Sequence, residues 1–212
     1  MSTWIFDRRV LALALVLAIS GCAALPGGSG APTSLAVADG AVTVSGPRGY
    51  CIDTQTQRDS ASGSVVLLGS CAALQQSADA PRPDRDAVLS ATVAASPGAS
   101  PLAAMDDLTE FFQGEAGRAM LSRSGDADTV ELVDAYSREG VLFLHLRDSS
   151  AFEGPRVAPQ YWRALTEVRG HLVTLSVLSP ADSTLSPQGG LSTLEAFVRE
   201  MKRANPAPAG TG

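Results

Sequence analysis

Short stretches in which apolar and polar residues alternate dominate the middle of the chain. Residues 41–45 alternate and stop at Gly46-Pro47, residues 88–94 alternate again, and residues 65–68 form a short apolar run between two glycines. An alternation with a period of two places every second side chain on one face of a strand. A turn at residues 137–140 predicts a hairpin. Four further strands are expected, at residues 129–135, 141–147, 161–168 and 172–179.

Two other stretches repeat their apolar residues with the period of an α-helix. The first opens at Ser100-Pro101, with serine as the N-cap and proline in the first helical position, and we expect Gly114 and Gly117 to end it. The second precedes Asn205-Pro206, which stops a helix. Each helix should pack an apolar stripe on the sheet. The two stripes are Leu102, Met105, Leu108, Phe111 and Phe112, and Leu191, Leu194, Phe197, Val198 and Met201.

This order of elements predicts an α+β fold, in which a mostly antiparallel sheet is packed with two helices. Over residues 38–204 it resembles the PsbP-like sandwich, which also occurs in small lipidated envelope proteins. The resemblance is one of element order. It therefore implies an architecture and transfers no functional site.

The N-terminal residues follow a different pattern, in which Arg8-Arg9 precede an apolar run over residues 10–19 that ends in Ser20-Gly21-Cys22. The run has the length of a signal-peptide core and is too short to span a bilayer as a helix. The stretch resembles the lipobox of bacterial lipoproteins. That family implies a signal peptide over residues 1–21, cut just before Cys22, whose thiol carries a diacylglyceryl group. The alternative is an ordinary cleaved signal peptide followed by an unrelated cysteine.

Four short phrases strengthen the likeness to lipoproteins. They resemble uncharacterised lipoproteins of alphaproteobacteria, a family that implies no established activity. The phrases are Gly49-Tyr-Cys-Ile-Asp, Val66-Leu-Leu-Gly-Ser-Cys, Leu121-Ser-Arg-Ser-Gly and Tyr161-Trp-Arg-Ala-Leu.

Composition divides the rest of the chain into three parts. Residues 22–37, rich in Ala, Pro, Gly and Ser, are expected to be a flexible linker after the lipidated cysteine. Residues 38–204 are expected to form one α+β domain, and residues 205–212 a disordered tail. The whole chain has a net charge of −6, and removal of residues 1–21 takes away two arginines and one aspartate. This acidity argues against a nucleic-acid partner and against a membrane held by charge.

Cys51 and Cys71 remain once Cys22 is assigned to lipid. Each lies at the end of a strand-like segment, and export places both in an oxidising compartment. We expect a structural disulfide between them. The alternatives are free or buried thiols, and a redox-active pair, although the close spacing of a Cys-x-x-Cys site is absent.

Candidate catalytic groups are few. His145 or His171 could act as a general base with Ser122, Ser124 or Asp148, but the chain contains no Gly-x-Ser-x-Gly elbow. A histidine on an apolar strand is more often a hydrogen-bonded core or edge residue. Residues 126–131 lack the glycine and the spacing of a calcium loop. The sequence therefore predicts no catalytic residue, no cofactor and no metal site.

Two turns and one aromatic cluster are candidate binding features. Residues 46–49 and 122–125 could hold an anion through backbone amides and an arginine, although such clusters are usually plain turns. The possible partner surface is Tyr161, Trp162 and Arg163, because tryptophan and arginine are favoured at interfaces. On a strand these neighbours point to opposite faces, so the alternative is a core tryptophan beside an exposed tyrosine.

Together these features predict a membrane-anchored, periplasm-facing lipoprotein with a non-enzymatic binding or assembly role. Its partner would be an envelope protein or another envelope component. Because Ala23 and Ala24, rather than aspartate, follow Cys22, analogy with enterobacterial sorting favours the outer membrane over the inner membrane. The rival hypotheses are a small hydrolase with a histidine base and a carrier of a small apolar ligand.

Overall fold

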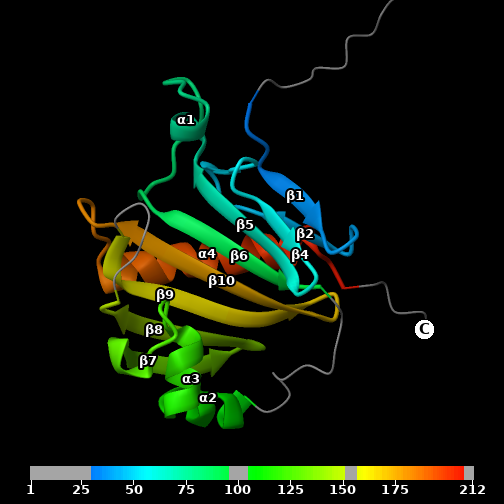
Figure 1. Ribbon diagram of the computed structural model, residues 1–212. Coiled ribbons are helices and arrows are strands. Elements are labelled where there is room, and N and C mark those ends of the chain that lie inside the picture. Colours follow the sequence, from blue (N-terminus) through cyan, green and yellow to red (C-terminus); the bar gives the residue numbers. More distant parts are fainter. Residues whose placement is uncertain (1–29, 96–104, 151–156, 208–212) are drawn as a thin grey trace, which may run out of the picture.

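An antiparallel sheet forms the centre of the computed structural model, which describes residues 30–95, 105–150 and 157–207. The strands run in the order β3-β5-β6-β10-β9-β8-β7, and β4 pairs with the first residues of β5 (Figure 1). Their bounds are β3 (Tyr50–Ile52), β4 (Arg58–Ser60), β5 (Gly63–Ser70), β6 (Val88–Ala94), β7 (Val130–Arg138), β8 (Val141–Asp148), β9 (Val157–Val168) and β10 (His171–Pro180).

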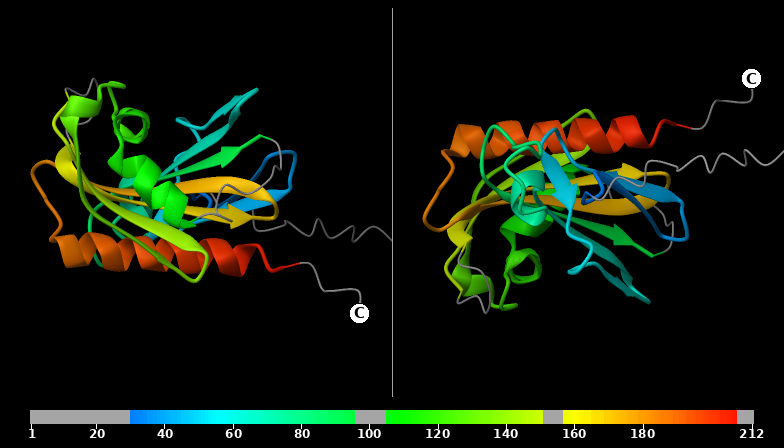
Figure 2. Two further views of the ribbon diagram at one scale, coloured as in Figure 1. Left: turned by 90° about the horizontal axis from the view of Figure 1, so that it is seen from below. Right: turned by 90° about the horizontal axis from the view of Figure 1, so that it is seen from above.

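Helices cover both faces of this sheet. Helix α4 (Pro187–Ala204) lies along one face, whereas α2 (Met105–Gln113) and α3 (Glu115–Leu121) lie on the opposite face near β7 and β8 (Figure 2). A small sheet of β1 (Ser34–Val37) and β2 (Val42–Ser45) packs against α4. The short helix α1 (Cys71–Leu74) stands at the end of the molecule away from α2 and α3 (Figure 1). A 3₁₀ turn, η2 (Ala127–Thr129), leads into β7.

The two faces have separate hydrophobic cores. The larger core lies under α4 and includes Phe143, Trp162 and Phe197. The smaller core lies under α2 and α3 and includes Phe112 and Leu144. Successive side chains of a strand point to opposite faces, so β8 supplies residues to both cores. This explains why almost all of that strand is buried.

Two tight hairpins connect the strands next to α4. The β7–β8 turn has positive φ at Glu139 (52°) and Gly140 (73°), and the β9–β10 turn has positive φ at Arg169 (53°) and Gly170 (80°). Positive φ at both central residues is typical of a type I′ turn, whose twist matches that of antiparallel strands. The hairpin predicted at residues 137–140 is confirmed.

The predicted fold class is confirmed as α+β with a mostly antiparallel sheet. The predicted C-terminal helix is also present. Ser186 caps it by accepting a hydrogen bond from the backbone N–H of Gly189 (3.1 Å), and its apolar stripe packs on the sheet. No helix in the described ranges is both long and apolar enough to cross a membrane.

The prediction for the end of the middle helix was right for Gly114 and wrong for Gly117. Helix α2 ends at Gln113, just before Gly114. Gly117 lies inside a second helix, α3, instead of ending the first. A Cβ at this position would lie 2.1 Å from the carbonyl oxygen of Phe111, so the glycine permits close packing of α3 on α2. The predicted N-cap and first helical residue, Ser100 and Pro101, lie outside the described residues, as does Leu102.

The sequence did not predict β1, β4, α1 and η2, nor α3 as a separate helix. Strand β1 falls within the range expected to be linker, and its pairing with β2 places residues 34–37 in the fold. At the other end, Asn205 was expected to begin the tail. Its side chain instead accepts a hydrogen bond from the N–H of Thr43 (2.8 Å) and donates one to the carbonyl of Thr43 (2.7 Å).

Candidate functional site

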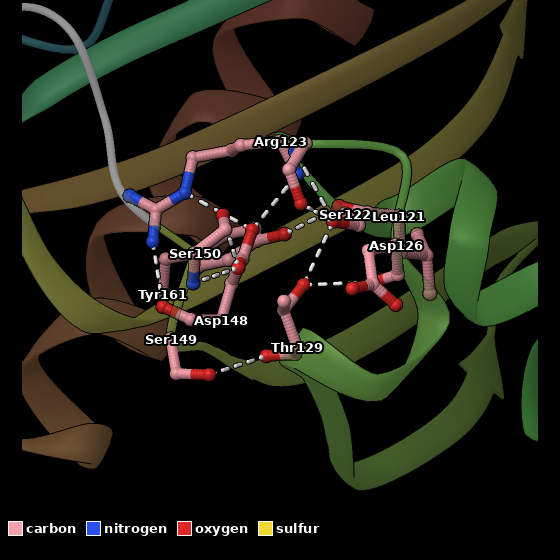
Figure 3. Close-up of polar contacts among 10 residues, drawn as sticks. Leu121, Ser122, Arg123, Asp126, Thr129, Asp148, Ser149, Ser150 and Tyr161 are labelled. Atoms are coloured by element: carbon pink, nitrogen blue, oxygen red, sulfur yellow. Dashed lines mark hydrogen bonds and ion pairs between the residues drawn. The ribbon is translucent and has the colours of Figure 1, made fainter.

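The most extensive polar network in the described part of the smaller-core face centres on Asp148, the last residue of β8. Arg123, in the loop after α3, donates to Asp148 Oδ2 from its backbone N–H (2.9 Å) and from Nε (3.0 Å). Ser150 donates to Oδ1 from its N–H (2.9 Å) and its hydroxyl (2.6 Å). We call Arg123, Asp148 and Ser150 the Asp148 clasp (Figure 3).

Electrostatics keep the Asp148 carboxylate ionised although it is buried. Burial alone would raise its pKa, but the hydrogen bonds from Ser150 and Arg123, together with the positive charge of Arg123, lower the pKa below its ordinary value. A carboxylate has about four lone-pair sites, and four donors occupy them here. The clasp therefore fixes the loop to the strand end and leaves this carboxylate little capacity to take up a proton or a cation.

A second set of contacts lies next to the clasp and joins the loop after α3 to the start of β7 and the end of β8. The Ser122 hydroxyl bonds the Thr129 hydroxyl (2.9 Å), and the backbone N–H of Ser149 donates to the carbonyl of Thr129 (2.8 Å). The Asp126 carboxylate accepts from the N–H of Asp128 (3.0 Å), which caps η2. These bonds join the segment before β7 to the segment after β8, at the end of this strand pair opposite the β7–β8 turn (Figure 3).

This geometry bears on the hypotheses of an anion-binding turn and of a calcium loop. The loop 122–125 was considered as an anion cradle, and the anion that its Arg123 amide and guanidinium hold is the protein's own Asp148. In the segment considered as a calcium loop, Asp126 caps η2 and Glu131 pairs with Arg147 (3.4 Å). In the other candidate cradle, the amide of Gly46 is bonded to the carbonyl of Thr33 (3.2 Å).

Tyr161 lies beside the clasp, on β9. Its hydroxyl donates to the carbonyl of Leu121 (3.0 Å), and the guanidinium groups of Arg163 (5.4 Å) and Arg123 (6.0 Å) lie near its ring. Burial raises the pKa of this hydroxyl, and the positive charge of Arg163 opposes that rise. Tyr161 thus ties β9 to the end of α3.

The exposure predicted for the Tyr161, Trp162 and Arg163 surface was wrong. The side chains of Tyr161 and Trp162 are only 3% and 6% exposed, and Arg163 is half-buried with its Nε bonded to the Ser176 hydroxyl (3.2 Å). Successive residues of a strand do point to opposite faces, as expected, but both faces of β9 are covered by helices. Neither ring is therefore available to a partner.

Trp162 contacts a predicted candidate, His145, under α4. The two rings stack at 4.5 Å between centroids, and Trp162 Nε1 donates to the carbonyl of Pro187 (2.9 Å) at the start of α4. Burial lowers the pKa of His145 below its ordinary value. The cavity beside these rings measures about 10 Å³, which is the room of one water molecule at most.

The histidines and the serines proposed as their partners are not brought together. His145 stacks on Trp162 under α4, whereas Asp148 belongs to the opposite face of the same strand. His171 is buried, and its Nδ1 bonds the carbonyl of Ala94 (2.8 Å) at the far end of the sheet. Both histidines therefore occupy core positions next to their own sheet neighbours.

The predicted disulfide is confirmed. Cys51 on β3 and Cys71 at the start of α1 are bonded, with their Cα atoms 4.8 Å apart. It lies where the backbone N–H of Cys71 donates to the carbonyl of Gly49 (2.9 Å). The proposed lipidation site, Cys22, lies outside the described residues.

Large apolar side chains are exposed around the two short helices. Phe111 on α2 is 40% exposed, Met120 on α3 is 71% exposed and Val133 on β7 is 45% exposed, and these three elements pack together. The sequence pattern placed Phe111 in the core stripe and missed α3 altogether. Gly114, which ends α2 at Gln113, is the local signal that this helix is too short to cover all of its apolar residues.

Comparisons with protein-family models, with curated proteins and with solved structures found no match to this chain.

Proposed function

We propose that this chain is a lipoprotein anchored through Cys22, with its folded domain facing the periplasm and binding an envelope protein. The pattern from Arg8 to Cys22 carries the proposal, because two arginines, a short apolar run and a Ser-Gly-Cys ending are what acylation and cleavage require. The outer membrane is favoured by the alanines that follow Cys22. A PsbP-like relation for the domain is proposed from its element order alone.

The disulfide supports export. Disulfides persist in oxidising compartments and are rare in the cytosol. Cys51 and Cys71 are the two cysteines that an acylated Cys22 leaves, and they pair with each other. The disulfide and the proposed signal peptide thus point to the same compartment.

The exposed residues on α2, α3 and β7 support a binding role. Met120 is largely exposed, and Phe111 and Val133 lie on elements packed against its helix. Exposed apolar surface on neighbouring elements is one of the marks of a protein contact site. The Asp148 clasp fixes the loop that follows α3 and so restrains the C-terminal end of that helix, which lowers the cost of ordering it on binding.

Site-specific crosslinking in intact cells tests the binding role. A photoreactive amino acid at Met120 should capture one defined envelope protein, whereas the same group at Ala61, an exposed position in the β4–β5 turn, should not. Val133→Glu should abolish the adduct at position 120 while leaving the melting temperature unchanged. Equal capture at both positions, or an adduct that survives Val133→Glu, would contradict a partner site on α2, α3 and β7.

A further inference from the structure

We call residues 22–29, which connect the proposed lipid anchor to the first described residue, the anchoring segment. The residues that follow it are held to the domain by backbone hydrogen bonds. The carbonyl of Pro32 accepts from the N–H of Ile52 (2.7 Å), and the carbonyl of Thr33 accepts from the N–H of Gly46 (3.2 Å). A Cβ built on Gly30 would lie 3.0 Å from the side-chain amide of Gln75, so the first described residue lies against the end of α1. The described chain therefore begins beside α1.

That end of the domain is tightly built. The disulfide joins β3 to α1, and the N–H of Ala72 donates to the carbonyl of Pro81 (3.2 Å). Gly49, with φ of +87°, packs directly on the backbone of Arg82 and Pro83, where a Cβ would lie within 2.5 Å. The first described residues are thus bonded to a part of the domain that is cross-linked by a disulfide and close backbone contacts.

The length of the anchoring segment limits how the domain can turn. Eight Cα-to-Cα steps separate Cys22 from Gly30, and these span at most about 29 Å. A folded domain of about 180 residues has a radius of gyration of about 16 Å and hence a diameter of about 40 Å. The segment is shorter than the domain is wide, so the end opposite the attachment point cannot reach the bilayer.

The opposite end carries α2 and α3. In Figure 2, α1 is nearest to the reader in the view from above, and α2 and α3 are nearest in the view from below. The sheet order agrees, because β3 and β7 are at its two ends. The exposed side chains of Phe111, Met120 and Val133 are therefore far from the attachment point.

We propose that α1 and residues 75–83 face the bilayer surface and that α2, α3 and β7 point away from it into the aqueous space. This orientation rests on the proposed lipid anchor at Cys22. The residues facing the bilayer include exposed Asp79 and Arg82, of opposite charge, so the covalent tether and not charge holds this face to the membrane. The apolar residues of the opposite end are then presented to a protein partner instead of to lipid.

Two exposed alanines give a matched pair of probe positions. Ala78 lies in the loop after α1, and Ala116 lies on α3. Each is replaced by cysteine in the full lipidated chain and labelled with a fluorophore without reductant, so that the Cys51–Cys71 disulfide stays intact. The protein is then placed in vesicles of phosphatidylethanolamine and phosphatidylglycerol that contain a headgroup-linked quencher. Quenching at position 78 should be several-fold stronger than at position 116.

The same preparations separate the orientation from the anchor. Mass spectrometry of each sample reports whether Cys22 carries lipid. Equal quenching at the two positions in lipidated protein, or stronger quenching at 116, would overturn the orientation and leave the anchor standing. An unmodified Cys22 would overturn both.

Lengthening the anchoring segment tests the physical reason for the orientation. Insertion of about twenty Gly and Ser residues after Gly28 makes the segment longer than the domain is wide. The difference in quenching between positions 78 and 116 should then shrink, with no change in melting temperature. A difference that persists undiminished would show that tether length does not set the orientation.

Discussion

The two faces of the sheet are covered in different ways. One face carries a single 18-residue helix, α4, over the larger core, whereas the other carries α2 and α3, of nine and seven residues, over the smaller core. The α4 face is held mainly by apolar burial. The α2–α3 face adds the Asp148 clasp and still leaves Met120 exposed.

Helix length explains this difference. A short helix buries little surface and leaves many of its terminal backbone groups without intrahelical partners. Helix α4 begins with a capping hydrogen bond from Gly189 to Ser186, whereas the N-cap of α3 is Gly114, which provides no side-chain cap. The contrast indicates that the α4 face contributes most of the stability. The α2–α3 face contributes a surface with exposed apolar side chains.

The largest effect should come from truncating the core under α4. Phe197 is completely buried, and Phe197→Ala should cost about 3–5 kcal/mol of unfolding free energy. The matched substitution on the other face, Phe112→Ala, should cost about 3 kcal/mol or less, because the smaller core can collapse around the lost ring. Urea unfolding of both variants checks the ranking. A greater loss for Phe112→Ala would reverse the assignment of stability to the α4 face.

Removal of the disulfide should weaken both faces together. Cys51 and Cys71 are separated by 20 residues, and closing a loop of this length stabilises a fold by about 3 kcal/mol in the chain-entropy estimate. The double variant Cys51→Ala/Cys71→Ala should unfold in a single transition at lower urea concentration. If only the unfolding transition of α2 and α3 moved to lower urea concentration, the disulfide would not stabilise the whole domain.

Breaking the clasp should produce an effect confined to the α2–α3 face. Asp148→Asn replaces an acceptor oxygen with an amide that opposes N–H donors, and we expect a loss of about 2–3 kcal/mol. The neighbouring pair of Glu131 and Arg147 is exposed, so Glu131→Gln should cost less than about 0.5 kcal/mol. Hydrogen exchange should quicken near residues 122–129 in the first variant and stay unchanged along α4. Similar losses for the two variants would show that burial of the clasp contributes nothing.

The unfolding free energy should fall in two steps as the pH is lowered. The first and smaller step comes from His145 on the α4 face, and the second comes from Asp148 on the α2–α3 face. The folded-state pKa of His145 is lowered from 6.5 by burial, so below that pH the unfolded state binds more protons and stability falls as pH decreases. The pKa of Asp148 is lowered from 3.8, and its contribution is lost only as pH falls further. His145→Phe should keep the stack on Trp162 and flatten the dependence between pH 7 and 5. An unchanged slope in this variant would assign that step to another group.

Much of the fold could be predicted because its signals are local. The stripe of Phe197 and Met201, the alternation of β6 and the turn at residues 137–140 each reveal an element without knowledge of the rest. The disulfide followed from the position of Cys51 and Cys71 at strand ends. All of these were confirmed.

The candidate site depended on contacts between distant residues, which local patterns do not carry. Arg123 and Asp148 are 25 positions apart, and no spacing rule pairs them. Burial of both Tyr161 and Trp162 required knowledge that helices cover both faces of β9. The break between α2 and α3 depended on the close approach of Gly117 to Phe111, which only the packed helices show.

The most direct measurement of the central proposal is intact mass spectrometry of the N-terminus of the protein isolated from its native membrane. The proposed lipoprotein should begin at Cys22, lack residues 1–21 and carry a diacylglyceryl thioether on that cysteine, and Cys22→Ala should accumulate as uncleaved precursor. A chain that retains residues 1–21, or that begins at an unmodified Cys22, would contradict it.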